Sequence, residues 1–430
     1  MKVKKLTLRN FRNIREEVFT PDAHLNFLLG SNGQGKTSFL EAIGYLSTLR
    51  SFRDSKTDDV IQYGQTFSEI TCELVPEIST NHPGDNSDGD NLWKTELKVV
   101  FQKSDSLTKK QSKAAFINGK PVKKSTQYLS QRFGSFELGF HSIVFNPADH
   151  DLVRGDPAVR RAYLDRVLAA EDIEYLKALQ KYNRILEQRN AVLRKNEAPQ
   201  REMLLGFTEQ LAQASAYLAL KRLEWIEKLQ ECLNFFSSRI APDQPELRLV
   251  YLSNWIPEIE NLCLLNNNLA TIYFTGQGHP PLLEQLIQFF WKKFSSIEMA
   301  EWKTGHSLMG AHRDDWTFFR GGQILRGHGS QGEVRTALLA LKMAEIRLFQ
   351  EKTGHRPLFL LDDFSSELDQ NRRSFLLNFL SESSLQVFVT TTDDSQVAGK
   401  QYWVVNGSLR ESKDDHRVSE RQSREFGRSE

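Results

Sequence analysis

The sequence lacks the features that mark secreted, zinc-binding or membrane-spanning proteins. Its three cysteines, Cys72, Cys232 and Cys263, lie far apart and form no C-x-x-C pair, which argues against a zinc site and a disulfide framework. No apolar stretch approaches the roughly 18 residues that a transmembrane helix needs, and no apolar segment follows the basic N-terminus. We therefore expect a cytoplasmic protein with reduced thiols and no membrane partner.

A large excess of charge of one sign is also missing. The 430 residues carry a formal net charge of +1, and 39% are hydrophobic and 26% charged. These values are typical of a globular chain that is long enough for two or three domains. Because the total charge is so small, any contact with nucleic acid must come from local basic patches.

One glycine-rich segment stands between an apolar run and a helical pattern. Residues 30–37 read GSNGQGKT and fit the phosphate-binding pattern G-x-x-x-x-G-K-[ST]. The glycines let backbone N–H groups turn toward phosphate oxygens, Lys36 supplies charge to the β- and γ-phosphates, and Thr37 offers a hydroxyl to Mg²⁺. The N-terminus of the following helix adds the positive end of its dipole. The segment therefore predicts a nucleotide site.

Two later segments bear on the same chemistry. Residues 357–363 read PLFLLDD, an apolar strand that would place Asp362 near Mg²⁺ and Asp363 near an attacking water. Residues 329–333 read GSQGE and precede a helical pattern, so they suit a second anion site at a helix N-terminus. The same residues also suit an ordinary capping box, with Ser330 at the N-cap and Glu333 three residues later.

The hydrophobic pattern of the chain changes twice. Strand-like apolar runs occur before residue 157 and after residue 304, and Asn-Gly pairs at 118–119 and 406–407 predict β-hairpins. Charged helical patterns dominate between them. We expect residues 1–156 and 305–410 to form an α/β domain and residues 157–304 to be a helical insertion. Residues 411–430 have few large apolar residues and are expected to be a disordered tail.

The order of these segments resembles that of a known protein family. A phosphate loop, a long helical insertion, an SQGE loop, an LLDD strand and the TTT at 390–392 follow one another as in SMC-like ABC-type ATPase heads. The stretches LTLRNFRNI at 6–14, FNPADHDLVRGDPAVRRAYLDR at 145–166 and GAHRDDW at 310–316 narrow the resemblance to the RecF family. The implied fold is α/β, an ABC-type P-loop ATPase head with an inserted helical arm domain.

The resemblance also implies roles for individual residues. Asp362 would bind the metal ion with Thr37, Asp363 would be the catalytic carboxylate, Asp369 would lie in the D-loop, and Thr391 or Thr392 would replace the usual switch histidine. Lys36 and Ser330 would also take part in catalysis. The candidate nucleotide-binding residues are Arg12, Gly30, Ser31, Asn32, Gly33, Gln34, Gly35, Lys36, Thr37, Ser38, Ser330, Gln331 and Gly332. No glutamine near residues 146–149 matches the usual Q-loop, so that role stays open.

The function that the resemblance implies is ATP-dependent DNA binding in recombinational repair, replication-fork restart and SOS induction. A slow, DNA-stimulated ATPase with ATP and Mg²⁺ would form a homodimer on single-stranded, gapped or duplex DNA, with RecR and RecO as partners. In such heads the SQGE loop of one copy completes the ATP site of another. Two alternatives are the ATPase subunit of a transporter, which has a shorter insertion, and an SMC-like defence ATPase, which usually carries an added catalytic domain.

A lysine-rich stretch around the first predicted hairpin is a candidate DNA contact. Lys109, Lys110 and Lys113 belong to a run of seven lysines between residues 101 and 124, where Asp105 is the one acid. Lysines at this density suit phosphate contacts without base specificity. A solvated hairpin face would have the same composition, so both interpretations stand.

Overall fold

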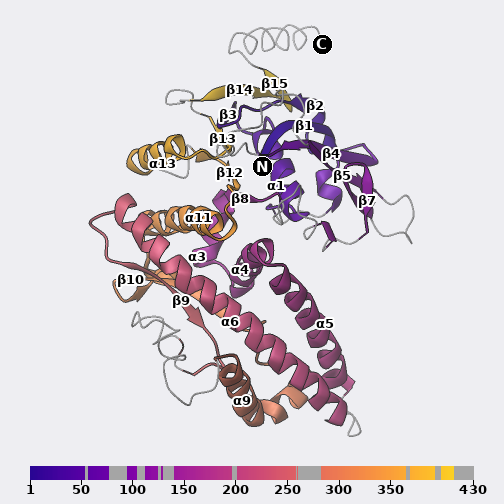
Figure 1. Ribbon diagram of the computed structural model, residues 1–430, viewed down its shortest axis with the longest axis vertical. Coiled ribbons are helices and arrows are strands. Elements are labelled where there is room, and N and C mark those ends of the chain that lie inside the picture. Colours follow the sequence, from indigo (N-terminus) through magenta and orange to yellow (C-terminus); the bar gives the residue numbers. More distant parts are fainter. Residues whose placement is uncertain are drawn as a thin grey trace, which may run out of the picture. The chain divides into compact units, whose positions relative to one another are not determined.

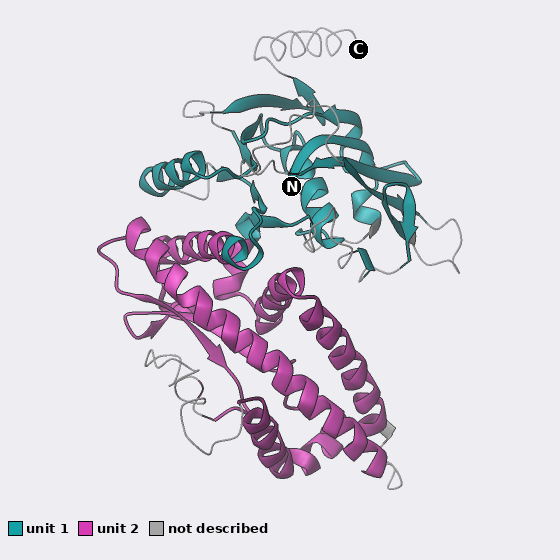
Figure 2. Ribbon diagram, viewed as in Figure 1, with its two compact units in different colours: residues 1–148, 349–430 teal, residues 149–348 magenta. Residues whose placement is uncertain are grey.

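The computed structural model describes residues 1–53, 57–76, 94–103, 112–123, 127–128, 140–195, 201–257, 259, 282–364, 369–392 and 399–410. The predicted tail after residue 410 lies outside this range, as do Lys109, Lys110 and Cys263. The chain divides into two compact units, coloured separately in Figure 2. Unit 1 comprises residues 1–148 and 349–430, and unit 2 comprises residues 149–348.

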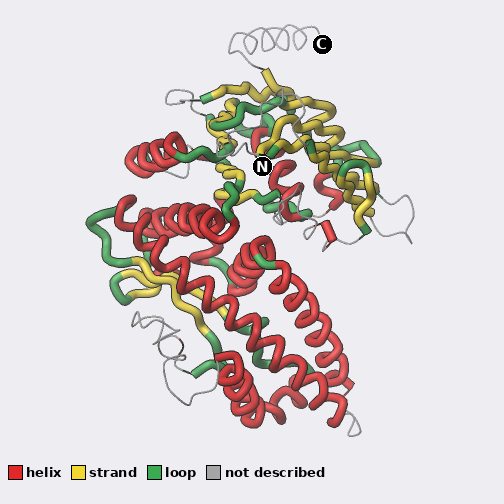
Figure 3. The backbone as a smooth tube through the Cα atoms, in the orientation of Figure 1, coloured by secondary structure: helices red, strands yellow, loops and turns green. Residues whose placement is uncertain are grey.

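Unit 1 contains two six-stranded sheets, which hold most of the strands in Figure 3. The first sheet is antiparallel, in the order β2-β1-β4-β5-β6-β7. The second has the order β15-β14-β3-β13-β12-β8, and its pairs from β14 to β8 are parallel. The elements of unit 1 are β1 (Lys2–Phe11), β2 (Ile14–Phe19), β3 (Leu25–Leu29), α1 (Lys36–Thr48), β4 (Phe67–Val75), β5 (Thr95–Gln102), β6 (Ser112–Ile117), β7 (Lys120–Val122), β8 (Ser142–Phe145), β12 (Leu358–Leu361), α13 (Gln370–Glu382), β13 (Val387–Thr391), β14 (Lys400–Val405) and β15 (Ser408–Arg410).

Helix α1 packs between the two sheets of unit 1. It contacts β1 and β5 of the first sheet and β8, β12 and β13 of the second. Leu40 and Ile43 of this helix share one apolar core with Leu6 and Val99 from the first sheet and Leu360 from the second. Eleven of its thirteen residues are buried, and the helix shows no polar face. Both features follow because the helix is covered by a sheet on each side. The phosphate loop before α1 is therefore attached to a rigid core.

Both predicted hairpins form. Asn118 and Asn406 have φ of 48°, and Gly119 and Gly407 have φ of 73° and 80°. Positive φ at both central residues is what a two-residue type I′ turn requires, and Asn-Gly adopts it with little strain. The first turn joins β6 to β7 and the second joins β14 to β15.

Unit 2 is built mainly from helices (Figures 1 and 3). Its longest helix, α6, has 40 residues and so spans about 60 Å. A small antiparallel sheet in the order β11-β10-β9 joins residues that lie on either side of α9 in the sequence. Its elements are α3 (Asp151–Arg154), α4 (Pro157–Glu171), α5 (Ile173–Lys195), α6 (Arg201–Ile240), β9 (Leu247–Leu252), α9 (Leu282–Thr304), β10 (Asp315–Arg320), β11 (Gln323–Ile324), α10 (Leu325–His328) and most of α11 (Gln331–Thr353).

The unit boundaries differ from the predicted ones. The sequence predicts an insertion from 157 to 304, whereas the compact unit extends from 149 to 348. Residues 305–348 belong with the helices because β10 pairs with β9 over six residue pairs. Polar contacts such as the Arg160–Asp315 ion pair then hold α4 to the same sheet. Among the described helices, none has both the length and the apolar content that a membrane span needs.

Candidate nucleotide-binding site

The strand ends of the parallel sheet bring the predicted phosphate and carboxylate residues together. Leu29 at the end of β3 pairs with Thr391 of β13, and Leu361 at the end of β12 pairs with Val389. Because these strands are parallel, the segments that follow them leave the sheet at one edge, where such folds bind ligands. The three strands are buried along nearly their whole length, which fits their continuous apolar sequences.

The phosphate loop has a backbone conformation that its glycines make possible. Gly30 has φ of 146°, and a Cβ at this position would lie 2.6 Å from the carbonyl oxygen of Val404. Gly35 has φ of 108°, and a Cβ there would lie 2.7 Å from the side chain of Asn13. A larger residue at position 30 would clash with backbone, one at position 35 would displace the Asn13 side chain, and both would strain the backbone. The loop can take this course only with glycine at both positions.

Polar contacts fix the loop and its lysine. The carbonyl of Gln34 accepts hydrogen bonds from Asn13 Nδ2 at 3.0 Å and from the N–H of Gly407 at 2.8 Å. Lys36 Nζ donates to the carbonyls of Gly30 at 2.6 Å and Ser31 at 2.9 Å. Burial lowers the pKa of Lys36, and the negative charges of Asp363 and Asp362 oppose this effect. The ammonium group is thus held at the centre of the loop, where the phosphate pattern requires it.

A hydroxyl–carboxylate network occupies the adjoining strand ends. Thr37 Oγ1 donates to Asp362 Oδ1 at 2.8 Å, and Thr390 Oγ1 donates to the same oxygen at 2.7 Å. The Thr390 hydroxyl also accepts the backbone N–H of Asp363 at 2.8 Å. Burial raises the pKa of Asp362, and the two threonine hydrogen bonds oppose the rise. Thr37 and Asp362 therefore lie close enough to share one ligand.

Thr390 belongs to the site although the sequence did not indicate it. The resemblance assigns the switch position to Thr391 or Thr392, but the hydroxyl that reaches Asp362 and Asp363 belongs to Thr390, which also lines the cleft. Successive side chains of a strand point to opposite faces, so Thr391, which is 2% exposed, faces the other way. Three consecutive threonines gave no signal for choosing among them, and only the register of β13 against its neighbours does so.

Replacing Thr390 with valine tests this network. The change keeps the shape of the side chain but removes both hydrogen bonds, which costs on the order of 1–3 kcal/mol when a shielded polar group loses its partner. We expect a lower thermal unfolding midpoint and weaker Mg²⁺-dependence of nucleotide binding, measured by calorimetry. The matched control, Thr390→Ser, keeps the hydroxyl and should behave as wild type. Equal behaviour of the valine and serine variants would show that the hydroxyl is not needed.

Arg12 reaches the site from the turn between β1 and β2. Its guanidinium donates two hydrogen bonds to Glu41 of α1, from Nε to Oε2 at 2.9 Å and from Nη2 to Oε1 at 2.5 Å. Nη1 donates to the Asp59 carbonyl at 2.6 Å. Glu41 is fully buried and also accepts a hydrogen bond from Ser51 at 2.6 Å. Two parallel bonds to a buried carboxylate fix the plane of the guanidinium. Arg12 is therefore held rigidly beside the loop.

A cleft of about 1200 Å³ in unit 1 joins these parts. Its walls include phosphate-loop residues, both carboxylates, Arg12 and Thr390. They also include Asn146, which follows β8 at the same sheet edge. The sequence alone suggests no role for this residue. Besides Arg12, Asn146 and Thr390, the residues that line the cleft are Asn13, Asn32, Gly33, Gly35, Lys36, Thr37, Ser38, Phe52, Arg53, Asp58, Asp59, Ile61, Gln62, Tyr63, Lys103, Pro147, Ala148, Asp362 and Asp363.

The oxygen donors of the cleft suit Mg²⁺ bound together with a nucleotide. No group of three or more metal-binding side chains occurs in the part of the chain that the structure describes. Mg²⁺ usually needs only one or two protein oxygens, because phosphates and water complete its shell. Thr37 Oγ1 and Asp362 Oδ1, 2.8 Å apart, are placed for that purpose. They would hold the ion, which would neutralise negative charge on the bound phosphates.

The SQGE segment lies in unit 2, at the start of α11. Ser330 and Glu333 form the reciprocal contacts of a capping box: the N–H and Oγ of Ser330 each donate to Glu333 Oε2 at 2.8 Å, and the N–H of Glu333 donates to Ser330 Oγ at 3.2 Å. These bonds lower the pKa of Glu333. Gln331 and Gly332 occupy the first turn of the helix. The capping interpretation is therefore confirmed, and it leaves an anion-binding role open because the two are compatible.

Two other predicted site residues have contacts of their own. Asp369 caps α13, since its side chain accepts the N–H of Arg372 at 3.0 Å. Lys113 of β6 donates to the carbonyl of Leu49 at 2.8 Å and lies 5.4 Å from the centre of the Tyr45 ring. Burial lowers the pKa of Lys113. Its ammonium group is therefore partly engaged within unit 1.

Comparison with known proteins agrees with this geometry. Residues 2–407 match the family described as RecF/RecN/SMC N terminal domain. The chain is 35% identical over 395 residues to the "DNA replication and repair protein RecF" of Geobacter metallireducens, covering 92% of this chain and 94% of that one. It is 31% identical over 404 residues to the RecF of Rippkaea orientalis, covering 91% and 93%.

Solved structures give the same result. One titled as the recombination mediator protein RecF-ATP in the RecFOR pathway superposes with a TM-score of 0.78 and 26% identity, covering 95% of this chain and 97% of that one. The Smc head domain of Pyrococcus furiosus, at 15% identity and a TM-score of 0.51, shares the fold. The fold is thus that of an SMC-like ABC-type ATPase head. Within that class the chain belongs to the RecF family.

Proposed function

We propose that this chain is an ATP-dependent DNA-binding protein of DNA replication and recombinational repair. The observation that carries the proposal is the cleft in which Lys36, Thr37 and Asp362 meet at one sheet edge. The relatives' description as DNA replication and repair proteins supports the DNA-directed part. The structure titled as RecF-ATP supports ATP as the nucleotide. Membership of the RecF family speaks against a transporter subunit or a defence ATPase.

In the proposed cycle, ATP closes two copies of the chain on DNA. The triphosphate would bind at the glycine-rich loop of one copy, and Thr37 and Asp362 would hold Mg²⁺. Ser330 and the first N–H groups of α11 of the second copy would face the γ-phosphate, because a helix N-terminus favours negative charge. A symmetric dimer would contain two such sites. Loss of the γ-phosphate would remove these contacts and release the DNA.

The chemical step would be slow, DNA-stimulated hydrolysis of ATP to ADP and phosphate. Asp363 would orient the attacking water, Lys36 and Ser330 would neutralise charge that develops on the γ-phosphate, and a threonine of the 390–392 run would sense its loss. This cycle of ATP binding and hydrolysis would act in the cytoplasm during replication-fork restart and SOS induction. RecR- and RecO-type proteins would be its partners, as the pathway in the neighbour's title suggests.

The DNA contact is proposed for the lysine-rich stretch near the first hairpin. Lys109 and Lys110 lie outside the described residues. Lys113 has its ammonium group bonded to the Leu49 carbonyl, so a phosphate would have to share it or replace that carbonyl. We therefore expect Lys109 and Lys110 to contribute more to DNA affinity than Lys113.

Sedimentation of the wild-type chain tests the proposed function. Analytical ultracentrifugation would compare the protein without nucleotide, with ADP, with ATP and with a non-hydrolysable ATP analogue. Each condition would be repeated with single-stranded, duplex and gapped DNA. We expect a dimer only with the triphosphates and the tightest DNA binding with the analogue. A chain that stays monomeric with ATP and DNA would contradict the clamp.

A further inference from the structure

The loop before α11 is held from outside its own segment by Arg154. This arginine is the last residue of α3. Its Nη2 donates an exposed hydrogen bond to the carbonyl oxygen of Gly329 at 3.0 Å, across 175 positions of sequence. Gly329 in turn donates its N–H to the carbonyl of Leu325 at 3.0 Å. The contact joins the segment DHDLVRGDP, residues 149–157, to the segment GSQGE, and both lie within unit 2.

The bonded carbonyl controls the orientation of Ser330. The carbonyl of Gly329 and the N–H of Ser330 belong to one peptide group, and a peptide group is planar. Arg154 holds the oxygen of this group, while Glu333 Oε2 accepts its N–H at 2.8 Å. The plane is therefore fixed from both sides. Without Arg154, only the capping box would orient it.

The backbone next to Arg154 is bonded to a part-buried ion pair. The next residue, Gly155, donates its N–H to the Asp151 carbonyl at 2.9 Å, and its own carbonyl accepts a hydrogen bond from Arg160 Nη1 at 2.7 Å. A Cβ on Gly155 would lie 2.6 Å from the Asp151 carbonyl oxygen, so the close turn needs glycine. Arg160, whose side chain is fully buried, forks onto Asp315 at 2.7 and 2.8 Å.

This network gives a role to residues 310–316 and to residues 149–166, none of which line the nucleotide cleft. Asp315 and Trp316 come from GAHRDDW, and Trp316 Nε1 donates to the carbonyl of Arg160 at 2.9 Å. Both strand β10 and helix α4 therefore support the end of α3 from which Arg154 extends. A guanidinium that extends from a well-packed helix end can orient the peptide to which it donates.

We propose that Arg154 is a positioning residue for dimer closure. It orients the Gly329–Ser330 peptide so that Ser330 and the first turn of α11 can meet the γ-phosphate held by a second copy of the chain. This inference rests on the proposed function. Arg154 acts through Gly329 and is not among the residues that line the nucleotide cleft. Its loss should therefore weaken the dimer and leave ATP binding by the monomer intact.

The test compares four variants in two measurements. Binding of a fluorescent ATP analogue at protein concentrations too low for dimers gives the monomer affinity, and sedimentation with ATP gives the dimer Kd. Arg154→Ala should leave the first within about 2-fold of wild type. It should raise the dimer Kd about 4- to 10-fold, because the bond is exposed and roughly 2- to 3-fold is lost at each of two equivalent loops. Arg154→Lys, which can donate one bond to Gly329, should restore part of the loss.

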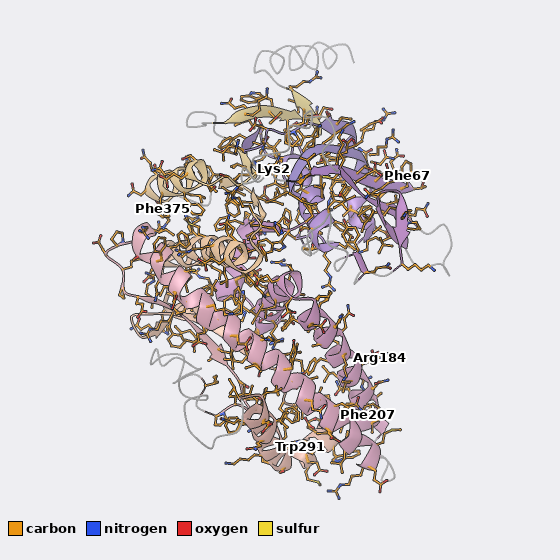
Figure 4. The ribbon with its side chains drawn as sticks, viewed as in Figure 1. Lys2, Phe67, Arg184, Phe207, Trp291 and Phe375 are labelled. Atoms are coloured by element: carbon orange, nitrogen blue, oxygen red, sulfur yellow. The ribbon has the colours of Figure 1, made fainter. Side chains whose placement is uncertain are left out.

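The other two variants separate the possible failures. Ser330→Arg should bind ATP but not dimerise, and Arg184→Ala removes an exposed arginine of α5 (Figure 4) as a matched control. If wild type does not dimerise, the proposed function fails. If wild type dimerises, Ser330→Arg does not, and Arg154→Ala equals wild type, the inference alone is overturned. Weaker ATP binding by the Arg154→Ala monomer, or an equal effect of Arg184→Ala, would also overturn it. Should Arg154→Ala not fold, Arg154→Gln takes its place.

Discussion

Replacing Lys36 with methionine is expected to abolish ATP binding at working concentrations. The Lys36 ammonium lies among the loop carbonyls of Gly30 and Ser31, at the point where the β- and γ-phosphates would bind. Removing one member of a desolvated charge pair costs about 2–5 kcal/mol, which corresponds to a loss of roughly 30- to 4000-fold in affinity. Methionine has nearly the same length and is apolar, so the loop keeps its packing but not its charge.

Calorimetric titration with Mg²⁺ and ATP measures this effect directly. The matched control is Lys5→Met, because Lys5 lies in β1 of the same unit and makes only a partly exposed contact of 3.9 Å with Glu73. That variant should bind ATP as wild type does. The two variants should have similar far-ultraviolet circular dichroism. If Lys36→Met bound ATP with the wild-type affinity, the glycine-rich loop would not be the triphosphate site.

Local sequence patterns were sufficient for the parts of the site that are contiguous in the chain. The glycine-rich loop, the apolar strand that ends at Asp362 and the capping box at Ser330 each depend on neighbours within a few residues. The hairpins at 118–119 and 406–407 were predictable for the same reason, since Asn-Gly selects its own turn. In these segments backbone preference and chemistry point to the same conformation.

Contacts between distant residues could not be predicted in this way. Thr390 reaches Asp362 because of the register of two parallel strands, and the sequence shows only three equal threonines. Arg154 and Gly329 meet through the packing of α3, α10 and β10, which no periodicity indicates. The boundary at 348 has the same cause, since β10 pairs with a strand that precedes it by more than sixty residues. Long-range pairing of this kind is decided by the whole core.

Replacing Asp363 with asparagine is expected to separate ATP binding from ATP hydrolysis. Asp363 has φ of 54°, a left-handed conformation that asparagine adopts as readily as aspartate. Its backbone N–H donates to Thr390 Oγ1, and this bond survives the change because it does not involve the Asp363 side chain. The variant should therefore keep the shape of the site while losing the carboxylate that would orient the attacking water. Removal of such a group lowers rates by about 10²- to 10⁴-fold.

We expect the ATP-bound dimer of the Asp363→Asn variant to dissociate more slowly than that of wild type. If hydrolysis opens the dimer, a variant that binds ATP but turns it over slowly should sediment as a dimer with ATP alone, where wild type cycles between the two states. Phosphate release and sedimentation of the same sample would show both effects together. Asp22→Asn is the matched control, because Asp22 accepts the N–H of His24 at the opposite end of β3. Wild-type turnover by Asp363→Asn would remove Asp363 from the catalytic role, and slow turnover without dimer accumulation would separate hydrolysis from opening.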